Sequence, residues 1–568
     1  MLECIPDNKG DNYFPERLQM EADKKLSAMT KEDLAGLKEK YADYEKWNKP
    51  NEEKNIVVGK SEDAIGNHIT AARVEYEKSE LDGVTYYHIP IFQNKVVWLT
   101  LSFNADQYKD YISELQLLVS FINDRNFNDF YGLDTQEAKT LLTRYIKASV
   151  HIGQNYDEAE GYDRSYIRVD ISAIVLEENI PDVIRMIHHM LFDIYVVIPG
   201  FDKKILNAIE QVQDNLFDYP EEYNTAIAGY SQDEIYRYQD QLDGLSYYRF
   251  LCALRDGGPD ALSSFYSNCY AMLNRIFNNN NLSVFCSSTD RGLKLVKKAV
   301  SDKPFEKARA DSFSRLDKDY KKSIRCTRDF DIRREYKKIK KYVLQNFMNE
   351  SAEKWFTHVQ PDGENPNIGI IIPSNVNYLS FYGRVPRYNY MGKFTGILKI
   401  ATQILEDHYL RTELREQGGA YGYYVKSFND GSVEITSARD PHIERTMKII
   451  LECADYLRNI PITEDELEII KQSYVGIFLD SEKEDPFSKE NIVKNIEIGH
   501  MNPDFDNVRL DSIKNCTLED IRETADLIQQ MLDNGAFCVF GSRQDIEECS
   551  DMFGYIERFD DMEDPEET

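Results

Sequence analysis

The order of strand-like and helix-like segments occurs twice along the chain, and this repetition restricts the possible folds more than any other feature. The first copy reads as a strand, a helix, two strands, two helical stretches and a closing strand, at residues 96–103, 111–123, 148–152, 166–175, 181–191, 203–238 and 281–287. The second copy follows the same order, at residues 368–372, 378–381, 393–416, 419–426, 432–437, 442–458, 464–480 and 536–541. Such an internal repeat predicts two copies of one α+β unit.

A short N-terminal region precedes the two copies. Leu2–Ile5 has the pattern of a strand, and the helices Glu16–Ser27 and Lys31–Trp47 should follow it, with Thr30 and Asp33 as an N-cap signal between them. The predicted organisation is a helical hairpin linker at 1–60, α+β domains at 61–310 and 341–568, and a charged linker at 311–340.

Composition excludes several classes of function. The chain has 99 acidic and 68 basic residues and a formal net charge of -31, so a nucleic-acid binder is not expected. The acidity indicates either solubility alone or a chamber that attracts basic peptides. No apolar run is long enough to span a membrane, and the first residues lack the pattern of a signal peptide.

Cysteine and histidine spacing argues against a metal site in this chain. There are nine cysteines, with no CxxC pair, which favours a reducing compartment such as the cytoplasm, or an organelle matrix if a transit peptide precedes the chain. No histidine begins a His-x-x-Glu-His or His-Glu-x-x-His motif. The adjacent His188 and His189 lie in an apolar helical pattern and are expected to be core or edge residues. We therefore expect no metal ligand and no cofactor in this chain.

The segment LRTELREQGGAYGYY, at 410–424, is the most informative run. An amphipathic helix ends near Arg415, and Gly418 is a natural residue for the left-handed position after it. Gly419 and Gly422 leave the backbone bare around Tyr421, so that another chain could approach. Arg415 and Tyr421 could both donate hydrogen bonds to a developing oxyanion. The alternative is an ordinary helix end with a strand after it.

This segment resembles the second-half signature of the pitrilysin/insulysin family, in its presequence-protease branch. The resemblance extends to the segments GLSY at 244–247, IPSNVNY at 372–378 and SARDP at 437–441, and the helical hairpin is similar to the family's inter-half linker. It implies a fold of two homologous metallopeptidase-like domains behind that linker. It also implies catalytic roles for Arg415 and Tyr421, and substrate-binding roles for Gly418, Gly419, Ala420 and Gly422.

The resemblance further implies what the chain would need from elsewhere. Members of the family carry zinc on an inverted motif in the N-terminal half, and this chain has no such motif. The expected function is therefore that of a C-terminal half, which encloses unfolded peptides and donates its Arg and Tyr to a zinc-bearing partner half. A catalytically silent structural or interaction homologue is the alternative. Neither nucleic acid nor membrane is an expected partner.

Overall fold

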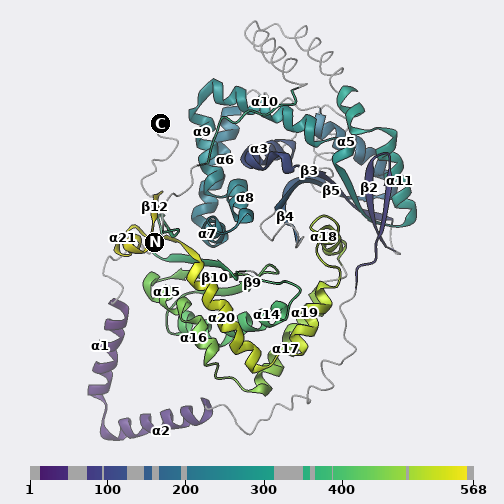
Figure 1. Cartoon of the computed structure of the whole chain (residues 1–568). Helices are drawn as coiled ribbons and strands as arrows, with labels where there is room; N and C mark the ends of the chain where they lie inside the picture. Colours follow the sequence, from purple (N-terminus) through teal and green to yellow (C-terminus); the bar gives the residue numbers. More distant parts are fainter. Residues whose placement is uncertain are drawn as a thin grey trace. The chain divides into compact units, whose positions relative to one another are not determined.

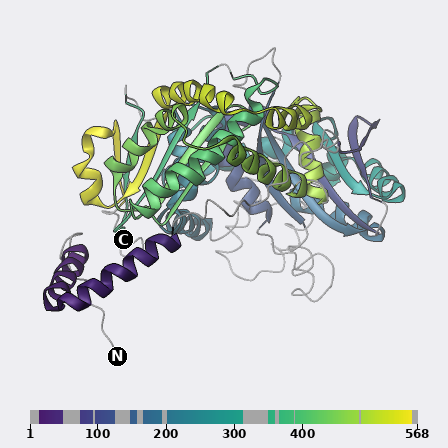
Figure 2. The same cartoon turned by 90° about the horizontal axis from the view of Figure 1, so that it is seen from below.

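The computed structural model divides the chain into two compact units, residues 1–64 and 65–568 (Figures 1 and 2). The residues described are 13–48, 73–91, 95–123, 146–156, 165–192, 201–311, 349–358, 365–386, 388–481 and 485–559. The strand expected at Leu2–Ile5 and nearly all of the linker expected at 311–340 lie outside them.

The first unit contains the two expected helices, α1 (Tyr13–Ala28) and α2 (Lys31–Asn48). Their junction is a reciprocal cap. The backbone N–H of Thr30 donates to Asp33 Oδ2 at 2.9 Å, and the N–H of Asp33 donates to Thr30 Oγ1 at 3.2 Å. Both donors would otherwise have no partner at the start of α2, so the cap fixes where that helix begins.

The second unit begins with a six-stranded sheet, in the order β1-β2-β6-β3-β5-β4. Its strands are β1 (Glu77–Leu81), β2 (Val84–Pro90), β3 (Val96–Asn104), β4 (Ile146–Gln154), β5 (Ser165–Leu176) and β6 (Leu282–Ser288). Its helices are η1 (Asp106–Tyr111), α3 (Ile112–Asn123), η3 (Glu177–Asn179), α5 (Ile180–Phe192), α6 (Phe201–Asp218), α7 (Pro220–Gly229), α8 (Glu234–Asp243), α9 (Leu245–Asp256), α10 (Gly258–Ile276), η4 (Asn279–Asn281) and α11 (Asp290–Asp302).

The helical stretch expected at 203–238 is three helices rather than one. Pro220 stands at the start of α7, where its missing N–H is tolerated. Asp233 caps α8 by accepting from the N–H of Ile235 at 2.9 Å. These two residues are start signals inside a pattern that periodicity alone reads as continuous.

A second six-stranded sheet follows, in the order β12-β7-β11-β8-β10-β9. Its strands are β7 (Ile368–Ile371), β8 (Asn377–Arg384), β9 (Gly422–Ser427), β10 (Ser432–Asp440), β11 (Ala536–Gly541) and β12 (Tyr555–Arg558). Its helices are α14 (Phe394–Ile404), η5 (Leu405–Glu416), α15 (Ile443–Leu451), α16 (Cys453–Arg458), α17 (Glu464–Ser481), α18 (Pro486–Glu497), α19 (Phe505–Lys514), α20 (Leu518–Asn534), α21 (Arg543–Glu548) and η6 (Ser550–Met552).

The strand orders confirm the α+β fold and the internal repeat. Five strands of each sheet run in the same order, β2-β6-β3-β5-β4 in one and β7-β11-β8-β10-β9 in the other. The outer strands β1 and β12 differ, because β1 pairs antiparallel with β2 while β12 pairs parallel with β7. The common five strands are therefore the repeated unit.

Each block also sends one helix onto the sheet of the other block. Helix α7 contacts β8, β10 and β11, and α18 contacts β2 and β6. In Figure 1, α7 lies against the second sheet and α18 lies beside the first. The two helices occupy the same place in the order of their blocks. This reciprocal exchange joins the two blocks into one compact unit.

Candidate functional site

The helix that leads into the candidate site changes its winding partway along. Residues Phe394–Ile404 form the α-helix α14, and Leu405–Glu416 continue as the π-helix η5. The N–H of Gln417 accordingly donates to the carbonyl of Thr412, five residues earlier, at 2.9 Å. The sequence pattern predicts a continuous α-helix here. Long π-helical stretches are rare and are frequent at functional sites, and this one leaves Leu410 and Leu414 buried while Arg415 is exposed.

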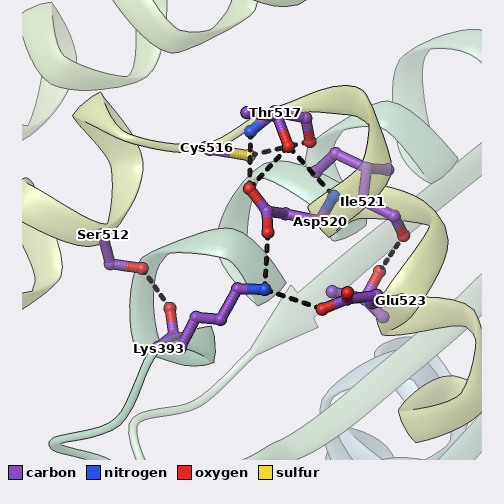
Figure 3. Close-up of polar contacts among 8 residues, drawn as sticks. Lys393, Ser512, Cys516, Thr517, Asp520, Ile521 and Glu523 are labelled. Carbon is purple, nitrogen blue, oxygen red and sulfur yellow. Dashed lines mark hydrogen bonds and ion pairs between the residues drawn. The ribbon is translucent and has the colours of Figure 1, made fainter.

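Contacts at the N-terminal end hold this helix against the rest of the block (Figure 3). Lys393 Nζ lies 2.6 Å from Asp520 Oδ1 and 2.7 Å from Glu523 Oε2, and Ser512 donates to the carbonyl of Lys393. Asp520 is also part of the capping box of α20 with Thr517. The start of α14 is therefore fixed to α19 and α20, so the far end of the helix is held by a rigid element.

The turn after the helix requires glycine at two positions for different reasons. A Cβ on Gly418 would lie 2.3 Å from Arg445 Nη1 and 2.5 Å from the carbonyl oxygen of Leu414, so no side chain fits there. Gly419 has φ +84°, in the left-handed region. The sequence pattern places the left-handed residue at Gly418. The structure corrects this to Gly419, because Gly418 is packed beneath the turn.

The structure brings the two predicted catalytic side chains together. The guanidinium carbon of Arg415 lies 6.0 Å from the centre of the Tyr421 ring, which is a cation–π contact. The N–H of Tyr421 donates to the carbonyl of Ala438 at 3.1 Å, which fixes its backbone against β10. The Tyr421 side chain is nevertheless 67% exposed. A pinned backbone and an exposed ring present the phenol hydroxyl to solvent.

The predicted substrate-binding residues differ in access. Gly419 is exposed and Gly422 is half-buried, whereas Gly418 and Ala420 are buried. Gly422 pairs with Ala438 at the start of β9, an edge strand that is bonded only to β10 in the described sheet. Of these four residues, Gly419 and Gly422 therefore have backbone within reach of another chain.

A second arginine, to which the sequence analysis assigns no role, faces the same ring. The guanidinium carbon of Arg439 lies 5.4 Å from the centre of the Tyr421 ring. Arg439 has φ +51°, which is uncommon for a residue other than glycine, and it sits where the pairing of β10 with β8 shifts register. A bulge within an Arg-Asp-Pro run has no sequence pattern that would have identified it.

The described residues do not form a metal site. They contain no group of three or more His, Cys, Asp or Glu side chains placed to hold a metal ion. His188 is buried, stacks edge-on against Phe305 with ring centres 4.6 Å apart, and burial lowers its pKa to about 3. The expectation of a core histidine is confirmed. No helix in the described ranges has the length and apolarity needed to cross a membrane.

Comparisons with known proteins agree with this architecture. A family model described as the PreP C-terminal domain matches residues 367–542, and one described as the region associated with the M16 peptidases of subfamily C matches residues 6–254. Protein HypA of Clostridium perfringens is 22% identical over 498 residues, 86% of this chain and 45% of that protein. The mitochondrial presequence protease of Mus musculus is 31% identical over 104 residues, 18% of this chain and 10% of that protein.

The chain spans less than half the length of these curated relatives. Among solved structures, the peptidase M16 inactive domain from Pseudomonas fluorescens aligns with a TM-score of 0.48 at 12% identity, over 82% of this chain and 98% of that one. The two family models lie in the same order as the two blocks, and together they cover most of the chain.

Proposed function

Because the chain is a presequence-protease-like C-terminal half of the pitrilysin family, we propose that it completes a peptidase active site by donating Arg415 and Tyr421 to a zinc-bearing N-terminal half. The observation that carries the proposal is the arrangement of these two side chains. They come from a helix end and from the start of an edge strand, and they meet as a cation–π pair with the tyrosine ring exposed.

The chemistry asked of this pair is stabilisation of negative charge. When a peptide bond is hydrolysed, its carbonyl oxygen becomes an oxyanion, and preorganised donors stabilise that charge. The Arg415 guanidinium offers several N–H donors and Tyr421 one O–H donor. The described residues do not fit a zinc site, so the zinc and its activated water would belong to the partner half, and this chain would supply only donors from the opposite side.

The division of the site between two halves would couple chemistry to enclosure of the peptide. Donors from this half reach the scissile bond only when both halves close around the substrate, and closure excludes water and completes the site. The net charge of -31 favours basic, unfolded peptides as substrates. All seven cysteines among the described residues are free, which is consistent with work in a reducing compartment such as the cytoplasm or an organelle matrix.

Reconstitution tests this proposal. The purified chain would be mixed with a zinc-bearing N-terminal half of the same family, and cleavage of an unstructured basic peptide would be followed. We expect cleavage only in the mixture, and a loss of about a hundredfold in turnover when Arg415→Ala replaces the unmodified chain. The matched control is Arg411→Ala, since Arg411 lies one turn earlier and pairs with Glu416 at 3.4 Å.

Two outcomes would overturn the proposal. If the two halves associate and Arg415→Ala cleaves at the unmodified rate, the pair only ends a helix, and the silent structural homologue is the correct interpretation. If the chain cleaves the peptide alone and holds about one zinc per chain, the division of labour between halves is wrong.

A further inference from the structure

Tyr421 is flanked by two arginines, and we propose that Arg439 joins Arg415 and Tyr421 to bind a carboxylate of the peptide. The proposal rests on the proposed function, because it names the ligand chemistry of the same site. Both guanidinium carbons lie within 6.0 Å of the centre of one exposed ring. A guanidinium that stacks on a ring keeps its N–H groups available for a ligand.

The backbone of Arg439 is held in a conformation that the residue would not adopt unaided. Its φ of +51° costs on the order of 1–3 kcal/mol and persists only where the surroundings impose it. The next residue, Asp440, provides that constraint. Its Oδ1 accepts from the N–H of His442 at 2.8 Å, and its Oδ2 accepts from Thr446 Oγ1 at 2.6 Å and from Ser437 Oγ.

The strand pairing then sends Arg439 toward Tyr421. Asn377 Nδ2 donates to the carbonyl of Asp440 at 3.1 Å and ties the bulge to β8. Gly422 is paired with Ala438, so Tyr421 and Arg439 are the next residues outward on the two strands. Directly opposed residues of an antiparallel pair share a face. The bulge therefore has a consequence beyond ending β10, which is a cation placed over the tyrosine.

Neither guanidinium is neutralised by a neighbour that the structure describes. Arg411 pairs with Glu416, but the described part of the chain gives no ion pair to Arg415 or Arg439. Two such arginines beside one ring are unusual on a chain with 99 acidic residues. A polyanion would be repelled by the net charge of -31, whereas a single carboxylate matches two guanidiniums and a phenol O–H.

A peptide offers that carboxylate from two sources, its C-terminus or an acidic side chain. The test is binding of four versions of one unstructured peptide to the full chain by fluorescence anisotropy with an uncharged dye. One version has a C-terminal carboxylate and an internal Glu. The second replaces the carboxylate by a carboxamide, the third replaces Glu by Gln, and the fourth makes both changes. The version whose change weakens binding identifies the source.

The variants separate charge from backbone effects. Arg439→Asn removes the guanidinium but keeps a residue that tolerates the left-handed region, and Arg439→Lys keeps the charge without the planar fork. We expect Arg439→Asn to raise the Kd of the carboxylate peptide about tenfold, from the loss of a charge-assisted hydrogen bond. Its effect on the doubly neutral peptide should be less than about twofold, and Arg439→Lys should recover part of the loss. Arg411→Asn is the matched control and should leave both unchanged.

The outcomes distinguish this inference from the proposed function. If the unmodified chain binds all four peptides equally, or if Arg439→Asn weakens all four alike with an unchanged unfolding midpoint, Arg439 does not recognise a carboxylate. That result leaves the turnover loss of Arg415→Ala in the reconstituted enzyme intact. Conversely, normal turnover of Arg415→Ala together with carboxylate-selective binding would remove the catalytic proposal and keep the binding site.

Discussion

The two exchanged helices make the same connection with different chemistry. In the first sheet, Ser102 of β3 pairs with Asp170 of β5, and in the second, Ser380 of β8 pairs with Thr436 of β10. These pairs stand at equivalent positions of the repeated sheet. Helix α18 lies over the first pair and presents a lysine. Helix α7 lies over the second pair and presents an amide and a hydroxyl.

At α18 the interface is a buried ion triad. Lys494 Nζ lies 2.7 Å from Asp170 Oδ2 and 2.7 Å from Glu490 Oε1, with all three residues buried. Burial raises the pKa of Asp170, but Lys494, His151 and Ser102 outweigh it, so that pKa is lowered. Burial lowers the pKa of Lys494, but the two carboxylates outweigh it and the pKa is raised. Both groups of the central pair are thereby held charged.

At α7 the interface is built from neutral donors around one carboxylate. Thr225 Oγ1 donates to Glu434 Oε1 at 2.6 Å and lies 3.1 Å from Ser380 Oγ, which in turn bonds Asn224 Oδ1. Thr436 Oγ1 lies 2.8 Å from Ser380 Oγ. One architecture therefore accepts either solution. The difference teaches that the α18 interface depends on one cation, whereas the α7 interface is spread over several weaker hydrogen bonds.

The largest expected effect is at Lys494. Lys494→Ala leaves Asp170 and Glu490 buried without their cation, which should lower the free energy of unfolding by roughly 3–5 kcal/mol. Urea unfolding followed by circular dichroism measures it, and hydrogen exchange should show the loss first in α18. Lys489→Ala, on the same helix and half-buried, is the control and should change stability by less than about 0.5 kcal/mol. A loss below about 1 kcal/mol for Lys494→Ala would show that the triad does not hold the blocks together.

A smaller effect is expected at Thr225. Thr225→Val keeps the shape but removes the donor to Glu434, and a buried acceptor that loses a partner costs about 1–3 kcal/mol. Thr225→Ser retains the hydroxyl and should recover most of that loss. The same urea titration measures both variants. If Thr225→Val costs as much as Lys494→Ala, the proposed contrast between the two interfaces disappears.

Acid should loosen α18 through Asp170. The folded pKa of Asp170 is lowered, so its contribution is fully present above the unfolded value of about 3.9 and is lost as the pH falls through the folded value. Hydrogen exchange, corrected for its intrinsic pH dependence, should show α18 opening more readily below about pH 4. Asp170→Asn should remove this pH dependence. An Asp170→Asn chain with the unmodified pH profile would mean that another group controls the opening.

The smallest effect is expected at Glu490. Burial, the largest cause, raises the pKa of Glu490 despite its contact with Lys494. A raised carboxyl pKa means that ionisation costs stability as the pH rises above the unfolded value of about 4.3. Glu490→Gln mimics the protonated form, so at neutral pH it should leave the urea midpoint unchanged or raise it slightly. A clear fall in the midpoint would show that both carboxylates are needed to balance Lys494.

The sequence predicts the elements of the sheets better than it predicts how the blocks meet. Val96–Asn104 is recognisable because alternate residues enter the core, as the burial of Leu99 and Leu101 confirms. Val84–Pro90 is not predicted from the sequence because both its faces are covered, with Tyr86 in the main core and Tyr87 in the small cluster that α18 completes. A helix some 400 residues later covers that second face, and no local pattern encodes it.

The candidate site divides in the same way. Arg415 and Tyr421 can be found because a helix end followed by glycines is a local signal, and the structure brings them together. Arg439 receives no role from the sequence, because a left-handed arginine depends on the Asp440 contacts, and those come from several elements. The π-helical winding of Leu405–Glu416 likewise has no distinguishing apolar spacing.

Turnover of Tyr421→Phe in the enzyme reconstituted with a zinc-bearing half tests the central claim most directly. The change removes one oxygen and keeps the ring between its arginines, so zinc content and the urea midpoint should be unchanged. Tyr219→Phe is the control, because Tyr219 is also exposed, at 53%, and lies at the junction of α6 and α7. We predict that Tyr421→Phe lowers kcat by about a hundredfold, with little change for Tyr219→Phe. Equal kcat for the two variants would contradict the claim that this half supplies a catalytic donor.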